Sequence, residues 1–219
     1  MNRVGNDIVD LTDPLAKGRS MDTRFIDRVF TSHEQEQIVN DGYPDVRIWC
    51  LWAGKETAYK ILCKLYGHIT SVPRRYEVRM SASDDNHDDN RPIISGVVRT
   101  PYGPVSIRIF NEEDYLHCIG VTGPEELMNS VVWGIHKAEP VEGEEYIYSP
   151  EAASVEIRKV ATKEIALCFQ EDIEHIDIFR FKGSHGLGPP TVYIKGKEAM
   201  IDISLSHDGH FLSYAFLQV

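Results

Sequence analysis

Two runs of short strand patterns constrain the fold of this chain more than any other feature of its sequence. Each run holds four segments rich in Val, Ile, Phe and Tyr, separated by turn residues. Segments of this length joined by short turns pair as antiparallel neighbours, so the sequence predicts two small antiparallel sheets. The first run comprises residues 74–80, 94–100, 104–110 and 115–121, and the second comprises residues 175–181, 191–194, 200–206 and 211–219.

A further strand and two helices precede the first run. Residues 3–11 are apolar enough to predict a strand buried on both faces. Thr31 and Glu34 have the spacing of a helix capping box, and Asp45 can cap a longer helix over residues 46–67. The first half therefore combines helices with a sheet.

The second half begins with a helix of its own. Ser149 is followed by Pro150, a pair typical of a helix start. The apolar stripe expected for this helix consists of Ile157, Ala161, Ile165 and Cys168. Each half thus offers helices and a small antiparallel sheet.

Composition marks the boundary between the halves. Residues 125–149 turn to Gly, Pro and Glu, which is typical of a connector. We therefore expect an α+β fold of two similar halves, with residues 1–124 as the first, residues 125–149 as the connector and residues 150–219 as the second.

Charge and composition exclude several classes of protein. The net charge of −11 argues against a nucleic-acid binder, which needs a surplus of Lys and Arg. No apolar run approaches the length of a membrane helix, and the N-terminus lacks the pattern of a signal peptide. The four cysteines form no CxxC pair and lie among apolar residues, which favours buried, reduced thiols. A cytoplasmic protein is the expectation.

The segment "ISLSHDGHFLSYAF", residues 203–216, gathers serine, histidine and aspartate. Neighbours on a strand point to opposite faces, so these residues cannot form a nucleophilic triad. The strand pattern presents His207 at the mouth of the sheet, just before an Asp-Gly turn. This position suits anion binding, but this stretch alone favours the alternative of a polar strand end with a surface histidine.

Asp7 lies within the first strand pattern, where aspartate is uncommon. A buried carboxylate needs a partner, which can be a helix or turn that it caps or a divalent metal ion. The sequence alone leaves both alternatives open.

The helix segment "WAGKETAYK" carries the third unusual pattern. Trp49, Glu56 and Lys60 lie on one stripe, with Lys55 and Tyr59 beside it. A Glu-Lys pair four residues apart is usually a surface feature. Here it shares its side of the helix with a tryptophan that should face the core, which favours the wall of a cleft.

These three stretches together resemble the 4′-phosphopantetheinyl transferase superfamily. They stand here as "GNDIV", "WAGKE" followed by Lys60, and "SLSH", and "RFIDRVFTSHE" is also similar to the family. The resemblance implies transfer of the phosphopantetheine arm of coenzyme A to a serine of an apo acyl or peptidyl carrier protein, with release of 3′,5′-ADP. A coenzyme A or nucleotide-binding regulatory module without transfer is the alternative.

The resemblance also implies roles for particular residues. Asp7 and Glu56 would bind Mg²⁺ together with the diphosphate of coenzyme A. Glu56 would also be the base for the carrier serine, either directly or through a metal-bound water, while Lys60 would stabilise the diphosphate.

The remaining implied residues bind the coenzyme. Lys55 and His207 would anchor its phosphates, and Ser206 would add a hydrogen bond. Two positions depart from the family pattern, because Val9 stands where larger members carry a second acid and Pro189 replaces the lysine of a Gly-Lys-Pro stretch.

The order of the motifs bears on the oligomeric state. The larger, surfactin-synthetase-activating type of the family has the Ser-His half first, and this chain has it second. The small trimeric type matches the order found here but is about half as long. We therefore expect a monomer whose halves are permuted and whose site lies in a cleft between them.

Overall fold

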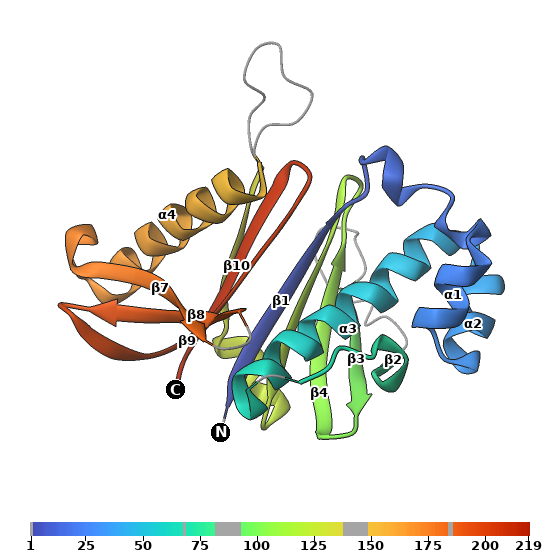
Figure 1. Ribbon diagram of the computed structural model, residues 1–219, viewed down its shortest axis with the longest axis horizontal. Helices are drawn as coiled ribbons and strands as arrows, with labels where there is room; N and C mark the ends of the chain where they lie inside the picture. The colour runs from blue at the N-terminus through green and yellow to red at the C-terminus, as the bar shows by residue number, and fades with distance from the viewer. Residues whose placement is uncertain (1, 68, 82–92, 138–148, 184–185) are drawn as a thin grey trace, which may run out of the picture.

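The computed structural model of the chain describes residues 2–67, 69–81, 93–137, 149–183 and 186–219. It is an α+β fold of two antiparallel five-stranded sheets that lie side by side, and a long helix packs on each sheet (Figure 1). The predicted fold class of two similar halves is confirmed. No helix in the described ranges is long and apolar enough to span a bilayer.

The first half forms one sheet covered by the longest helix. Its strand order is β1-β5-β4-β3-β2, and α3 packs against β1 and β5. The strands are β1 (Arg3–Asp10), β2 (Glu77–Met80), β3 (Ile93–Thr100), β4 (Gly103–Asn111) and β5 (Tyr115–Thr122). The helices are η1 (Pro14–Ala16), η2 (Arg19–Met21), α1 (Thr23–Val29), α2 (Ser32–Val39), α3 (Pro44–Tyr66) and η3 (Pro73–Arg75).

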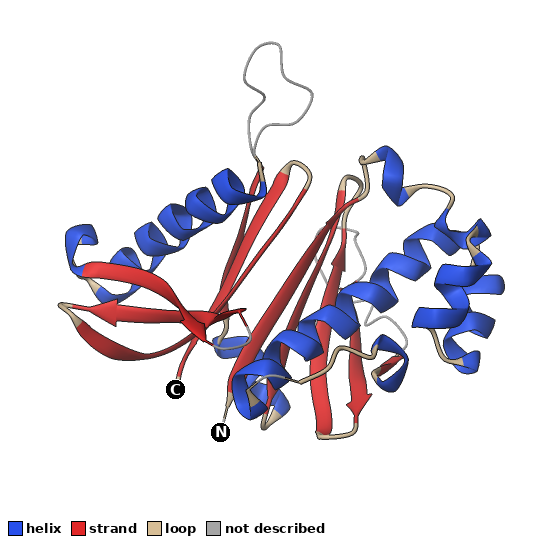
Figure 2. Ribbon diagram, in the orientation of Figure 1, coloured by secondary structure: helices blue, strands red, loops and turns tan. Residues whose placement is uncertain are grey.

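The second half repeats this plan. Its strand order is β6-β10-β9-β8-β7, and α4 packs on the sheet (Figure 2). The elements are η4 (Glu125–Ser130), β6 (Val132–Lys137), α4 (Pro150–Phe169), η5 (Ile173–His175), β7 (Ile176–Gly183), β8 (Gly186–Ile194), β9 (Lys197–Asp208) and β10 (Phe211–Gln218).

The two halves share one topology. In each, a first strand leads through a long helix to four further strands, and the fifth strand returns beside the first. This repeat corrects the expected connector over residues 125–149, because β6 is the first strand of the second sheet. Residues 132–137 all pair with β10, so they belong to the second half. Residues 138–148 of that stretch lie outside the described residues.

Several predicted helix signals are present. The Thr31–Glu34 capping box begins α2, and Ser149 caps α4 with Pro150 in the first turn. Asp45 does not cap α3, because the helix already starts at Pro44. Its carboxylate accepts hydrogen bonds from the amides of Gly18 and Ser20 instead.

The cysteines are all free thiols, but their burial differs. Cys50 and Cys118 are buried, Cys63 is partly exposed and Cys168 is exposed. The expected position of Cys168 on the apolar stripe of α4 is therefore wrong. The expected Ile157, Ala161 and Ile165 are buried, and the stripe extends from them to Ala153, one turn nearer to the helix start.

Side chains join the two sheets along the free edge of β1. In the first sheet β1 pairs only with β5, so its other edge would leave amide groups unpaired. Four of these amides donate to side chains of β9, in the pairs Val4–Asp202, Asn6–Ser204, Ile8–Ser206 and Asp10–Asp208, at 2.7–3.3 Å. We call this contact the seam. It explains the alternating polar residues of β9, whose opposite face packs Ile201 and Ile203 into the core under α4.

Candidate active site

Two clefts meet beside the seam. The larger cleft, of about 650 Å³, lies between α3 of the first half and α4, β7, β8 and β9 of the second. The carboxylate cleft, of about 380 Å³, lies between β1, the loop after it, α3 and the end of β9. His207 lines both of them. Residues of both halves thus line each cleft, and the two clefts share His207.

Asp7 and Glu56 both line the carboxylate cleft. Asp7 projects from β1 and Glu56 from α3, which packs closely on β1 because Gly5 has no side chain. A Cβ at Gly5 would lie 2.5 Å from the Thr57 carbonyl oxygen of α3. In the Gly-x-Asp-Ile pattern, Gly5 therefore lets α3 pack closely on β1, and Asp7, two residues later, supplies the carboxylate.

The electrostatic coupling of these two carboxylates is visible in Glu56. Burial raises the pKa of Glu56 to about 7, the charge of Asp7 also raises it, and Lys60 opposes both. A carboxyl group with such a pKa can accept or release a proton near neutral pH. Glu56 is thus suited to act as a general base.

Lys60 holds Asp7 in place. Its Nζ donates to Asp7 Oδ1 at 2.8 Å, to the Asn6 carbonyl oxygen at 2.9 Å and to Ser206 Oγ at 3.0 Å. These three bonds use the three protons of the ammonium group. Lys60 also lines the larger cleft. Its role in stabilising a diphosphate stays a prediction.

Ser206 lies in the seam rather than at a ligand surface. Its Oγ donates to Asp7 Oδ1 at 2.9 Å and accepts from the Ile8 amide and from Lys60. One donated and two accepted bonds exhaust the hydroxyl group. The structure therefore corrects the expectation that Ser206 binds the coenzyme, and Ser206 instead fixes Asp7 and Lys60 across the two halves.

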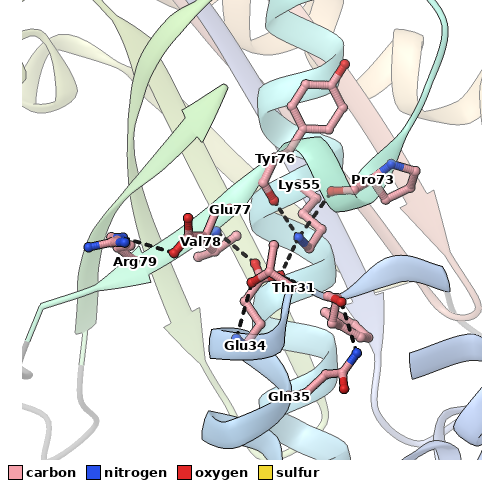
Figure 3. A network of polar contacts seen from close by, with 10 residues as sticks. Thr31, Glu34, Gln35, Lys55, Pro73, Tyr76, Glu77, Val78 and Arg79 are labelled. Carbon is pink, nitrogen blue, oxygen red and sulfur yellow. Dashed lines mark hydrogen bonds and ion pairs between the residues drawn. The ribbon is translucent and has the colours of Figure 1, made fainter. Parts of the chain in front are cut away.

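Lys55 also lies away from both clefts. Only 1% of its surface is exposed. Its Nζ contacts Glu34 Oε2 at 2.8 Å, the Pro73 carbonyl oxygen at 3.2 Å and the Tyr76 carbonyl oxygen (Figure 3). Lys55 therefore connects α3 to α2 and to the start of β2. The expectation that it anchors a phosphate is wrong, because its side chain points to the other side of α3 from Lys60.

His207 is the one expected coenzyme ligand that the structure brings to a cleft. It is exposed near the end of β9. Although the side chain is exposed, the protein around the ring partly desolvates it; this desolvation, followed by the charge of Lys60, lowers its pKa, while Asp7 raises it. The hairpin turn after it is held by Asp10, which accepts from the backbone amide and the ring of His210 at 2.9 and 2.7 Å. The turn that follows His207 is thus held to β1, and His207 itself lines both clefts.

The two clefts differ in charge. The described lining of the carboxylate cleft contains five acidic residues, namely Asp7, Asp10, Asp13, Glu56 and Asp208, beside Arg19. The described lining of the larger cleft contains no Asp or Glu and five cations, namely Lys60, Lys64, Arg158, Arg180 and Lys182. In a chain with a net charge of −11, this separation suits an anionic ligand that reaches toward a cation-binding cleft.

Sequence reasoning missed Arg158, Arg180 and Asp208. Arg180 follows Ile176 and Ile178 at alternate positions of β7, so the strand pattern could have shown a charge on an inward-facing row. Arg158 stands next to Ile157 on α4 and carries no comparable signal. The cleft position of Asp208, whose pKa burial raises to about 6, depends on the seam.

The donor set of the carboxylate cleft fits a magnesium ion. Asp7 and Glu56 offer hard oxygen ligands, and their mutual repulsion is one cause of the raised pKa of Glu56. Among the described residues no group of three or more His, Cys, Asp and Glu side chains could hold a metal ion. Magnesium commonly takes one or two carboxylates and completes its shell with water and substrate phosphates, so two protein ligands suffice.

Comparison with known families supports the resemblance in the sequence. Residues 3–119 match the family described as the 4′-phosphopantetheinyl transferase superfamily. This match covers more than half of the chain and includes β1, α3 and the carboxylates Asp7 and Glu56. No curated protein matches the chain. The chain belongs to the 4′-phosphopantetheinyl transferase superfamily, and it is a transferase of that kind.

Proposed function

We propose that this protein transfers the 4′-phosphopantetheine arm of coenzyme A to a serine hydroxyl of an apo acyl or peptidyl carrier protein and releases 3′,5′-ADP. Family membership supports the class of reaction. The observation that carries the proposal is the position of Asp7 and Glu56 in one cleft, which shares the lining residue His207 with a basic cleft. The proposal includes a cytoplasmic monomer whose partners are coenzyme A and the carrier.

The reaction assigns Glu56 the role of general base. The serine oxygen attacks the phosphorus that carries the pantetheine, and a new P–O bond forms. The bond between that phosphorus and the bridging oxygen breaks, and its electron pair leaves with 3′,5′-ADP. Glu56 takes the serine proton, for which its pKa of about 7 is suited.

Magnesium bound by Asp7 and Glu56 would supply positive charge that offsets the charge developing on the leaving diphosphate oxygen. The protein contributes the orientation of these ligands. Lys60 and Ser206 both contact Asp7 Oδ1, so this carboxylate is held before a ligand arrives. Such preorganisation avoids reorganisation during the reaction.

His207 would bind the phosphates of coenzyme A where the clefts join. Its position between them supports this role. The ammonium group of Lys60 already donates its three protons along the seam, so it would act on the diphosphate through its positive charge. His207 lines the cleft that contains Glu56, and Lys60 lines the larger cleft.

Mass spectrometry of a carrier protein tests the proposal. Purified protein is mixed with coenzyme A, magnesium and apo carriers from fatty-acid, polyketide and peptide synthesis, and we expect at least one carrier to gain one phosphopantetheine. Glu56→Gln should slow this gain at least about 100-fold, the usual scale for loss of a general base. Asp7→Asn should also slow it, with partial recovery at high magnesium. Glu126→Gln, an exposed carboxylate in η4, is the matched control.

Two outcomes would overturn the proposal. Coenzyme A binding without a mass gain on any carrier would indicate a binding module rather than a transferase. Wild-type rates in Glu56→Gln would remove Glu56 from the chemistry.

A further inference from the structure

Asn6 directly precedes Asp7 on β1, and its side chain lies on the other face of the strand. Gly5 and Asp7 face α3, because side chains alternate along a strand and a Cβ at Gly5 would touch that helix. Asn6 and Val4 face the second sheet instead, where Val4 packs with Ala215. Asn6 is 0% exposed. A polar amide group is thus buried among apolar side chains in the contact between the two sheets.

The polar groups of Asn6 reach four elements. Its backbone amide donates to Ser204 Oγ of β9 at 3.0 Å, and its carbonyl oxygen accepts from Lys60 Nζ of α3 at 2.9 Å. Its side-chain Nδ2 donates to Ser213 Oγ of β10 at 2.8 Å and lies 3.4 Å from His117 Nε2 of β5. This one residue therefore ties β1 to both sheets and to α3. We call the side chains of Asn6, His117 and Ser213 the amide cluster.

His117 is a neutral member of the amide cluster. Burial, followed by the charge of Lys60, lowers the pKa of His117 to about 3, so its ring is uncharged at physiological pH. The ring packs beside Phe110 and Trp133, with centroids 6.1 and 5.2 Å away. A neutral ring that carries its proton on Nδ1 presents Nε2 as an acceptor for the amide group of Asn6. The first sheet thus holds Asn6 from one side, and Ser213 holds it from the other.

Stability alone does not account for the amide cluster. Asn6 Oδ1 and His117 Nδ1 have no hydrogen-bond partner among the described residues. A buried polar atom without a partner destabilises the folded state, whereas apolar side chains in its place would carry no such cost. The amide cluster therefore indicates a requirement on the position of Asn6 rather than on the strength of the contact between the sheets.

The position of Asn6 bears directly on the Asp7 carboxylate. The ammonium group of Lys60 contacts both the Asn6 carbonyl oxygen and Asp7 Oδ1, at 2.9 and 2.8 Å. A shift of Asn6 relative to β10 would thus move the Asp7 backbone and the Lys60 contact together. The described linings of the two clefts include no member of the amide cluster. The cluster therefore acts on the site from behind β1.

We infer that Asn6 and Ser213 are positioning residues for the Asp7 carboxylate and that the hydrogen bond between them sets the metal affinity of the carboxylate cleft. This inference rests on the proposed function, which assigns Asp7 to magnesium. Magnesium demands near-ideal ligand geometry, so a small displacement of Asp7 weakens its binding. Ser213 belongs to β10, outside the matched residues 3–119. The second half thus contributes to the metal site without supplying a ligand through this serine.

Manganese binding tests the inference without requiring transfer. Mn²⁺, a paramagnetic substitute for Mg²⁺, is titrated into the full chain at a fixed coenzyme A concentration and followed by electron paramagnetic resonance. Samples without protein give the contribution of the coenzyme. Ser213→Ala and Asn6→Leu should each raise the dissociation constant for Mn²⁺ about 3- to 10-fold, the fold-change that one hydrogen bond is worth. The double variant should bind no more weakly than Asn6→Leu alone, because both substitutions remove the same bond.

Transfer assays provide a second readout. The magnesium concentration that gives half the maximal rate should rise by the same factor, while the maximal rate at saturating magnesium stays within about twofold of the wild-type rate. A lower maximal rate with unchanged metal affinity would overturn the inference, because it would place the effect on the chemical step.

Ser149→Ala is the matched control. It removes the cap of α4, a hydrogen bond of 3.2 Å from the Ala152 amide, and lowers stability far from β1. Urea unfolding measures the stability of each variant, and Ser149→Ala should bind Mn²⁺ as the wild type does. A merely structural role for Ser213 would lower stability and leave Mn²⁺ binding unchanged, which would overturn the inference. Equal weakening of Mn²⁺ binding in Ser149→Ala would also overturn it.

The outcomes separate this inference from the proposed function. If Asn6→Leu does not fold, Ser213→Ala, which removes a single oxygen atom, decides alone. Mn²⁺ binding that depends on Ser213 in a protein that modifies no carrier would support the positioning role and refute the transfer. A protein that modifies a carrier but keeps wild-type Mn²⁺ binding in Ser213→Ala would refute the positioning role alone. A wild-type protein that adds no Mn²⁺ binding to that of the coenzyme would overturn the positioning role and the metal site together.

Discussion

Replacement of Lys55 by methionine tests whether this lysine is structural. Methionine keeps an unbranched chain of similar length but removes the charge. The substitution leaves the Glu34 carboxylate, which is 0% exposed, without its cation. Glu34 would retain hydrogen bonds from the Thr31 and Val78 amides at 2.8 Å, but a buried charge without an opposite charge is strongly unfavourable.

The expected loss of stability is large. Removal of one partner of a buried ion pair typically costs about 3–5 kcal/mol. With a urea dependence of about 2–3 kcal/mol per M for a chain of this size, the unfolding midpoint should fall by roughly 1–2 M. A total stability of about 5–15 kcal/mol leaves most such variants folded without denaturant. The Michaelis constant for coenzyme A should then stay near the wild-type value, because Lys55 reaches neither cleft.

A double-mutant cycle isolates the pair. Glu34→Gln combined with Lys55→Met should be more stable than the sum of the single losses predicts, because no buried charge is left alone. Lys159→Met breaks the exposed pair with Glu156 and should change stability by less than about 1 kcal/mol. If Lys55→Met unfolds at the wild-type urea concentration but binds coenzyme A weakly, Lys55 is a ligand and our interpretation is refuted.

Three further predictions concern the site. The catalytic rate should rise with pH and level off above about 7, because Glu56 acts in its ionised form. The folded state should lose stability over the same pH range, because a raised carboxyl pKa favours folding only while the proton is bound. Glu56→Gln should remove both dependences, and a wild-type profile in that variant would contradict the assignment. His207→Ala should raise the Michaelis constant for coenzyme A about tenfold with little change in maximal rate, as for a group that binds ground and transition states equally, whereas His136→Ala, on the exposed part of β6, should do neither. Light scattering should find a monomer whose specific activity survives dilution, and an active trimer that loses activity on dilution would place the site between chains.

Periodicity in the sequence was sufficient to predict most of the fold. The strands over residues 74–121 and 175–219 alternate apolar and polar residues clearly enough to be read, and the Thr31 and Ser149 caps have local signatures. The strand β6 was missed because Gly, Pro and Glu dominate the residues around it. Only its pairing with β10 shows that it belongs to the second sheet.

The candidate site was less predictable, because burial on α3 is not one-sided. Lys55 and Glu56 are adjacent in sequence but point about 100° apart on the helix. One side of α3 meets α2 and the other meets β1, so the sequence alone could not decide which of the two residues faces the cleft. Ser206 was misassigned for a similar reason, because nothing in β9 shows that its polar face meets the amides of β1.

The shared topology of the halves does not produce two sites. Asp7 of β1 pairs with Cys118, the fourth residue of β5, and the corresponding partner of Tyr214, the fourth residue of β10, is Gly134. A Cβ at Gly134 would collide with the Tyr214 ring. The second sheet therefore has an aromatic ring where the first has a carboxylate.

The long helices α3 and α4 also differ in the side chains that they present. Toward the seam α3 presents Lys60 and Lys64, whereas the side of α4 that packs on its sheet is apolar. The two halves thus supply different chemistry, carboxylates from the first and cleft-lining arginines from the second. A ligand that needs both the carboxylates and the arginines must lie where the halves meet. The seam between β1 and β9 holds the two halves together within a single chain.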